Sequence, residues 1–354
     1  MIVYFYLYSF IKLTGLNKTN KNNSKKLKAY LENSSRILIA THLNADGDAV
    51  GSSLALALLL QKIGKKVTVV IPNDYPEFLS WMPGNDKILV HYRQQNKVKE
   101  RVEMADLLLC IDFNDPDRLG KARELIMSVK GPAVLVDHHP DPEDFADLVI
   151  SETYYGSAAE IVFDMMKEMD YMHLMDIDIA TCIYAGIMTD TGNFSYACSY
   201  PEIWNTVALL LNYGIEKDRI HSLVYDNYDE NRMKLMGYCL YEKMELIPEY
   251  NTAIISLSMD EMKKFKHKPG DTEGFVNMPF SIKGVKFTAL FIEKQDHVKI
   301  SFRSREDFSV NAFSRNHFNG GGHLNAAGGE TEKPMEKAIE KFKSLLPHYA
   351  KSLK

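Results

Sequence analysis

Apolar runs alternate with helical patterns through the first half of the chain. Four short runs rich in apolar residues lie at 36–40, 66–71, 105–111 and 133–136, and the last two are continuous, as expected of strands buried on both faces of a sheet. Helical patterns separate these runs, and apolar residues recur at helical spacing over 53–63. Strands that alternate with helices predict an α/β domain with a doubly wound, mainly parallel sheet.

The pattern changes in the second half. Three further helices are predicted without strands between them, at 157–170, 177–189 and 202–213. After a polar stretch, strands are predicted at 252–258, 285–292 and 298–302, and an amphipathic helix at 332–346. We therefore expect a first domain over 25–215, a linker over 216–244 and a smaller α+β domain over 245–354.

Acidic and histidine residues gather at the ends of these predicted elements. They are His42, Asp46, Asp48, Asp112, Asp137, His138, His139 and Asp190. Because the carboxyl ends of parallel strands meet at one edge of a sheet, residues far apart in sequence can converge there. Gly47 lies between Asp46 and Asp48. We expect it to let the backbone bend so that these two carboxylates turn toward one point.

These residue types suit a divalent cation. Imidazole and carboxylate ligands favour Mn²⁺ over Ca²⁺. A calcium loop that starts at Asn44 or Asp46 would need a glutamate at its twelfth position, where the chain has Ala55 or Ala57. Each acid alone has an ordinary explanation as a turn or cap residue. Together, without a cation, they would repel one another.

Composition and charge narrow the class of protein. The chain has 354 residues, of which 25% are charged, and a formal net charge of -5, which argues against a protein that coats long duplex DNA. Its cysteines, Cys110, Cys182, Cys198 and Cys239, lack CxxC spacing, so buried free thiols in a reducing cytoplasm are expected. The apolar stretch 1–11 is too short to span a membrane as a helix and lacks the features of a signal peptide. We treat it as a packing segment or an over-long start, and expect no membrane partner.

The chain resembles the DHH phosphoesterases, which are named for the triplet seen here as Asp137-His138-His139. The resemblance extends to 42–48, Asp112 and Asp190, and to the glycine-rich stretch 320–329, which is similar to the DHH-associated C-terminal domain. Five motifs in order make the match specific, and length and architecture look most like the nanoRNase/pAp phosphatase branch. One departure is Asn44, where many members carry proline.

The resemblance implies a site for two divalent ions, most simply Mn²⁺, with Mg²⁺ or Co²⁺ as alternatives. One ion would be held by His42, Asp46 and Asp112. The other would be held by Asp48, Asp112, His138 and Asp190, so that Asp112 bridges the two. His139 would face the phosphoryl group as a hydrogen-bond donor or as an acid to the leaving oxygen. Asp137 would orient an imidazole.

The second domain is expected to bind substrate. Its candidate contacts are Arg303, Ser304, Gly321, Gly322, His323 and Asn325. Arg303 can bind phosphate bidentately, and we expect the glycines at 320–322 to leave backbone N–H groups exposed as an anion nest. Arg303 could equally be an ordinary edge-strand charge. The glycine run lacks the lysine of a P-loop.

The implied activity is hydrolysis of very short single-stranded RNA to mononucleotides, and removal of phosphate from 3′-phosphoadenosine 5′-phosphate. Alternatives with the same chemistry are hydrolysis of linear or cyclic dinucleotides, a RecJ-like single-strand exonuclease and an exopolyphosphatase. An alternative of another class is a nucleotide-binding regulator with a structural metal site. A homodimer is possible, and the polarity of cleavage is left open.

Overall fold

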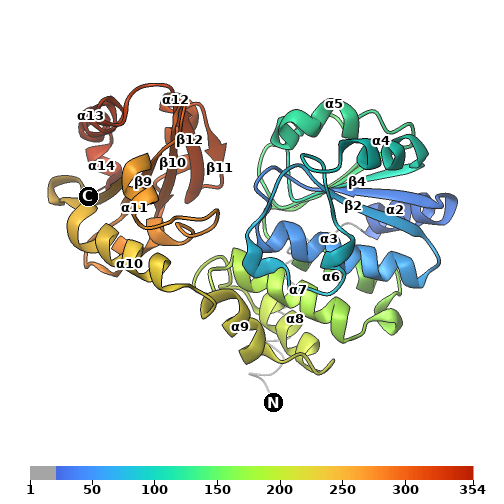
Figure 1. Ribbon diagram of the computed structural model, residues 1–354. Coiled ribbons are helices and arrows are strands. Elements are labelled where there is room, and N and C mark those ends of the chain that lie inside the picture. Colours follow the sequence, from blue (N-terminus) through green and yellow to red (C-terminus); the bar gives the residue numbers. More distant parts are fainter. Residues whose placement is uncertain (1–20, 354) are drawn as a thin grey trace, which may run out of the picture. The chain divides into compact units, whose positions relative to one another are not determined.

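The computed structural model of the protein describes residues 21–353 (Figure 1). The apolar stretch 1–11 lies outside these residues. The chain divides after Asp226 into two compact units. In the part that the structure describes, every helix is too short or too polar to cross a membrane.

The first unit contains a six-stranded sheet in which every neighbouring pair of strands is parallel. In spatial order the strands are β3 (Leu89–Val90), β2 (Lys66–Ile71), β1 (Arg36–Ala40), β4 (Leu107–Ile111), β5 (Ala133–Asp137) and β6 (Leu148–Ser151). The chain first builds outward from β1 and then returns to place β4 on its other side. The prediction of a doubly wound parallel sheet is confirmed.

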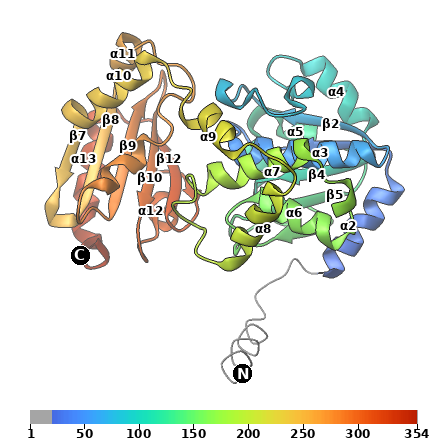
Figure 2. The same cartoon turned by 90° about the horizontal axis from the view of Figure 1, so that it is seen from below.

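Helices cover both faces of this sheet (Figure 1). On one face, Ile37 and Ile39 of β1 share a core with α3 (Gly47–Lys62), α6 (Ala158–Glu168) and α7 (Ile177–Asp190). On the other, Leu38 and Ala40 pack in a core with α4 (Gln95–Met104) and α5 (Arg123–Ile126). Three further helices, α2 (Lys21–Asn33), α8 (Pro201–Leu211) and α9 (Lys217–Tyr225), add to the first core. Of these, α8 lies against α6 and α7 (Figure 2).

Glycines bring α3 and α7 unusually close together. A Cβ added at Gly51 would lie 2.5 Å from the carbonyl oxygen of Cys182, and one at Gly47 would lie 2.4 Å from Thr189 Oγ1. The expectation that Gly47 is needed for a backbone bend is wrong, because this residue is the first of α3 and lacks a positive φ. Gly47 is needed because a side chain there would collide with α7.

The second unit contains a mixed six-stranded sheet. Its strands, in spatial order, are β11 (Gly321–Gly322), β12 (Ala326–Thr331), β10 (Val298–Ser304), β9 (Phe287–Glu293), β8 (Thr252–Leu257) and β7 (Met244–Ile247). Only β8 and β9 pair in parallel. Its helices are α10 (Glu230–Tyr238), α11 (Met259–Lys264), α12 (Val310–His317), α13 (Met335–Leu345) and α14 (Ala350–Leu353). Phe287, Phe302, Phe313 and Phe342 form the centre of an aromatic core.

The segment expected as a linker, 216–244, is largely helical. It contains α9 and α10, and the division between the two units falls between these helices. The polar residues at 226–232 therefore mark the break between two short helices, and Asp229 caps the second of them through a hydrogen bond from Arg232 N at 2.9 Å.

Candidate metal centre

The first part of the site lies between β1 and α3. His42 follows the end of β1, and Asp46 is the N-cap of α3. Oδ1 of Asp46 accepts hydrogen bonds from the backbone N–H groups of Asp48 at 3.1 Å and Ala49 at 3.0 Å. Its Oδ2 lies 4.0 Å from His42 Nε2. One oxygen of Asp46 therefore caps the helix, and the other faces the histidine.

Asp112 occupies the centre of the site. It directly follows β4, which is the neighbour of β1 where the strand order reverses, the position at which open α/β sheets bind ligands. Asp112 Oδ2 lies 3.4 Å from His42 Nε2, and Asp112 Oδ1 lies 3.4 Å from His138 Nε2. The two oxygens of this buried carboxylate thus face different histidines, as a carboxylate that bridges two cations would. Its φ of 64° lies in the left-handed region, which is uncommon outside glycine.

His138 brings the remaining acids into the cluster. It directly follows β5, and its Nε2 lies 3.2 Å from Asp190 Oδ2 at the end of α7. The same nitrogen lies 3.8 Å from Oδ2 of Asp48, in the first turn of α3. Asp48 and His138 are buried, whereas Asp190 is partly exposed.

Backbone carbonyls orient both of these imidazoles. His42 Nδ1 lies 2.9 Å from the carbonyl oxygen of Leu43, and His138 Nδ1 lies 3.3 Å from that of Tyr155. Since a carbonyl can only accept, each ring donates a proton from Nδ1, and its Nε2 is the nitrogen that faces the carboxylates. Histidines that bind metals are commonly held in this way.

The cluster has the composition and size of a cation site. The ligand atoms of His42, Asp46 and Asp112 lie within 4.8 Å of one another, and so do those of Asp48, Asp112 and His138. His42 Nε2 and Asp112 Oδ1 are buried without a hydrogen bond in the region 21–353, although buried polar atoms are normally paired. Mixed nitrogen and oxygen donors suit Mn²⁺ and related ions. All six predicted ligands therefore lie in one cluster, and their role as ligands stays a prediction.

The charges of this cluster call for compensation. Burial, followed by the negative charges of Asp112 and Asp190, raises the pKa of Asp48 well above its usual range. Burial would lower the pKa of His138, but the nearby carboxylates of Asp190 and Asp112 raise it well above normal. Both shifts indicate that the clustered carboxylates need nearby positive charge, which protons or cations can supply.

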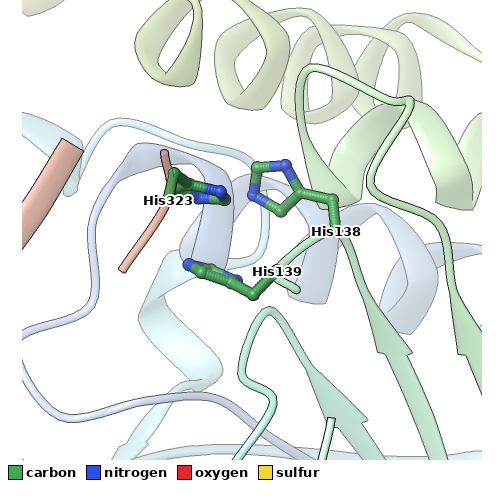
Figure 3. Close-up of side chains that lie close together, drawn as sticks. All are labelled: His138, His139 and His323. Carbon is green, nitrogen blue, oxygen red and sulfur yellow. The ribbon is translucent and has the colours of Figure 1, made fainter. Parts of the chain in front are cut away.

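His139 lies beside His138, but different groups hold its ring (Figure 3). The two rings are tilted by 68° with centroids 4.9 Å apart. His139 Nδ1 lies 2.7 Å from Asp137 Oδ1, and its Nε2 lies 3.1 Å from Nη1 of Arg118. Asp137 thus orients His139, in line with the expectation for this acid. Burial is the main cause that lowers the pKa of His139.

Asn44 has a backbone conformation that proline cannot adopt. Its φ of 57° lies in the left-handed region, whereas the ring of proline fixes φ near −65°. The Asn44 backbone N–H donates to Asn73 Oδ1 at 2.7 Å, and Asn73 Nδ2 donates back to Asn44 Oδ1 at 3.0 Å. This pair fixes the loop that carries His42 to the end of β2.

In the second unit, the predicted substrate contacts lie around the end of β10, which pairs with β12 on one side and β9 on the other, so Arg303 is not on an edge strand. Ser304 Oγ donates to the carbonyl of Phe308 at 2.5 Å and accepts from Asn325 Nδ2 at 2.9 Å. Asn325 Nδ2 also donates to the carbonyl of Glu306 at 2.9 Å. Ser304 and Asn325 thus fix the loop that follows β10, while the side chain of Arg303 is partly exposed on that strand.

The glycine stretch is not an open nest of N–H groups. Gly321 and Gly322 form β11, which pairs with β12, and the backbone N–H of His323 donates to Ala326 at 2.7 Å. A Cβ at Gly320 would lie 1.9 Å from the carbonyl oxygen of Gly328. These glycines allow the close pairing of β11 with β12. The expectation that they form an open anion nest is therefore wrong, because they adopt a paired strand.

Sequence reasoning missed Arg118 and Tyr155. In the sequence, Arg118 belongs to a polar stretch after β4 of the kind that usually faces solvent. Only its short distance along the chain from Asp112 could have indicated a role. Tyr155 contributes a backbone carbonyl, for which the residue type gives no signal.

Comparisons with known proteins identify the family of both units. Residues 36–187 match the model of the DHH family, N-terminal domain, and residues 251–352 match the DHHA1 domain. A Streptococcus mutans protein described as a probable bifunctional oligoribonuclease and PAP phosphatase, NrnA, is 28% identical over 324 residues, covering 91% of this chain and 97% of that protein.

Two further proteins bear on function. The crystal structure of an exopolyphosphatase-related protein from Bacteroides fragilis is 40% identical and superposes with a TM-score of 0.90, covering 96% of this chain and 99% of that one. The cyclic-di-AMP phosphodiesterase GdpP of Bacillus subtilis is 24% identical over 337 residues, which are 92% of this chain and 50% of that protein.

Proposed function

Because the chain belongs to the DHH family of phosphoesterases, we propose that it hydrolyses very short oligoribonucleotides to mononucleotides and removes a phosphate from 3′-phosphoadenosine 5′-phosphate. The observation that carries the proposal is the position of Asp112, whose two carboxylate oxygens lie 3.4 Å from the Nε2 atoms of His42 and His138. The names of relatives such as the S. mutans protein support this choice of substrates.

In this proposal the cluster holds two divalent ions, Mn²⁺ first among them. His42, Asp46 and Asp112 would hold one, and Asp48, Asp112, His138 and Asp190 the other. Divalent ions in such a pair lower the pKa of coordinated water and neutralise charge on the phosphoryl oxygens. The protein keeps both imidazoles aimed inward through the carbonyls of Leu43 and Tyr155.

The second unit would grip a terminal phosphate or a base of the substrate. Arg303 supplies the charged contact, because a guanidinium can bind a phosphate through two parallel hydrogen bonds. Ser304 and Asn325 would support the end of the strand that carries it, in keeping with their mutual hydrogen bond. His323 and the strand Gly321–Gly322 stay candidate contacts beside them. A fixed grip on one end of the substrate would favour short strands over cutting within long ones.

The test is to assay a panel of substrates with the protein in Mn²⁺ and with the protein after a chelator has removed its metal. The values of kcat/KM should be compared for oligoribonucleotides of increasing length, 3′-phosphoadenosine 5′-phosphate, cyclic and linear diadenylates and polyphosphate. The proposal expects the shortest RNAs and the bisphosphate to be the best substrates, and Asp112→Asn to be inactive on all. A preference for cyclic di-AMP would favour the second candidate, a dinucleotide phosphodiesterase, toward which the match to GdpP points.

A further inference from the structure

Arg118 is fixed by its backbone beside the candidate metal centre. It lies in the short helix η3 (Pro116–Ala122) that follows β4. The side chain of Asp115 caps this helix by accepting from Asp117 N at 2.7 Å, and Arg118 N donates to Asp115 O at 3.0 Å. The Arg118 carbonyl in turn accepts from Leu43 N at 2.7 Å. The loop that carries His42 and the helix that carries Arg118 are therefore joined directly.

The guanidinium of Arg118 pairs with a histidine and not with a carboxylate. Nη1 donates to His139 Nε2 at 3.1 Å, and on the other side of the ring His139 Nδ1 donates to Asp137. Four other arginines of this unit pair with acids, as Arg93 does with Asp74 at 2.6 Å. In the region 21–353 no carboxylate lies within 4.0 Å of the Arg118 guanidinium, even though acids are concentrated in this site.

In this arrangement, most N–H donors of the Arg118 guanidinium remain available to bind a ligand. A guanidinium carries five N–H donors, and a neutral imidazole nitrogen takes only one of them. Arg118 is partly buried, so its charge is less screened than at an open surface. The remaining donors suit an anion with oxygens in a fork-like arrangement.

We propose that Arg118 is a further catalytic residue, which binds a nonbridging oxygen of the phosphoryl group under attack. The inference rests on the proposed phosphoester hydrolysis and adds a protein donor to it. Negative charge grows on these oxygens during the displacement, and donors already in place stabilise it without reorganisation. His139, expected to face the phosphoryl group as a donor or acid, here accepts from the guanidinium and holds it in position, while Asp137 holds His139.

The direct test compares Arg118→Ala and Arg118→Lys with wild type on the best substrate of the panel. Loss of a fixed donor to a developing oxyanion costs roughly 10²–10³-fold in rate, so Arg118→Ala should lose that much kcat/KM. Lysine restores the positive charge but not the paired N–H donors of the guanidinium, so Arg118→Lys should recover only part of the lost kcat/KM. Millimolar guanidinium should partly rescue Arg118→Ala. Arg123→Ala removes an exposed arginine from the next helix and should stay within threefold of wild type.

A double-mutant cycle separates contact with substrate from positioning of His139. If Arg118 touches the phosphoryl group, Arg118→Ala should still cost at least tenfold in a His139→Ala background. A loss that disappears in that background, or an Arg118→Ala rate within threefold of wild type, would overturn the inference. Mn²⁺ titration calorimetry and circular dichroism should match wild type in each variant, and Arg118→Lys serves if Arg118→Ala does not fold. A wild-type chain inactive on every substrate would instead overturn the proposed function and the role of Arg118 with it.

Discussion

Asp48 Oδ2 accepts a hydrogen bond of 2.6 Å from the backbone N–H of Ala158, so a carboxylate on α3 closes the N-terminus of α6. Its Oδ1 accepts from the next backbone N–H, that of Ala159, at 2.9 Å. A helix N-terminus stabilises negative charge, which opposes the effect of burial and of the neighbouring acids on this group. Asp48 thus joins the packing of the helices to the candidate metal centre.

Asp48→Ala should therefore damage both stability and activity. Loss of the cap leaves two N–H groups of α6 without their partner and should cost about 1–2 kcal/mol of unfolding free energy. Urea denaturation in EDTA measures this cost apart from any effect of metal. An Asp48→Ala protein as stable as wild type under these conditions would mean that the α6 terminus finds another acceptor.

Asp112→Asn should behave differently. Asparagine keeps the size of the side chain and tolerates the left-handed backbone, so stability in EDTA should stay within about 0.5 kcal/mol of wild type, the range of harmless substitutions. Activity should fall by more than the roughly 10–100-fold typical of partners outside the ligand shell. Measurement of kcat/KM beside urea midpoints checks both, and near-normal turnover would argue against a bridging carboxylate.

Mn²⁺ should stabilise the wild-type chain. A ligand that binds only the folded state at a concentration 100 times its Kd adds about 2.7 kcal/mol, so Tm should rise with Mn²⁺ and fall again on chelation. Asp112→Asn should show a much smaller rise. An equal rise in both proteins would place the stabilising ion at another site.

Glu160 should make stability depend on pH. Burial is the main cause that raises its pKa from the ordinary 4.5 to about 7, and its carboxyl pairs with the Tyr200 hydroxyl. A carboxyl whose pKa is raised on folding adds stability below about pH 4.5, and this is lost as the pH rises through 7. Glu160→Gln should match wild type near pH 4.5 and be more stable at pH 8, by up to about 3 kcal/mol.

Urea denaturation in EDTA across this pH range measures the difference. Glu103, an exposed acid on α4, provides the matched control, because Glu103→Gln should leave the pH profile of wild type unchanged. A Glu160→Gln profile parallel to that of wild type would show that Glu160 titrates normally.

The approach of α3 to α7 should be intolerant of a single methyl group. Gly51→Ala would place Cβ 2.5 Å from the Cys182 carbonyl, and overpacking of this kind costs about 1–3 kcal/mol. Gly237 on α10 is the matched control, because a Cβ there meets nothing within 4 Å. Gly237→Ala should stabilise by roughly 0.5–1 kcal/mol through helix propensity. Equal midpoints for the two variants would contradict the close packing.

The sequence was most informative where one physical cause dominates. Buried strands such as β4 are nearly pure apolar runs, and polar residues at strand ends must meet at the sheet edge, so the fold class and the clustering of Asp112 with His138 could be predicted. The hairpin β11–β12 was missed because glycine carries no strand preference, and its pairing depends on tertiary packing. Arg118 was missed because its partner is twenty-one positions away.

The backbone at Asp112 restricts what this position can become. With φ at 64°, residues other than aspartate, asparagine and glycine would carry strain there. Of these three residues only aspartate offers a carboxylate for a cation, so the backbone and the cation chemistry together restrict this position to aspartate. A descendant of this protein that had abandoned hydrolysis would be expected to keep asparagine or glycine at position 112, which makes that site a simple marker for lapsed members among related sequences.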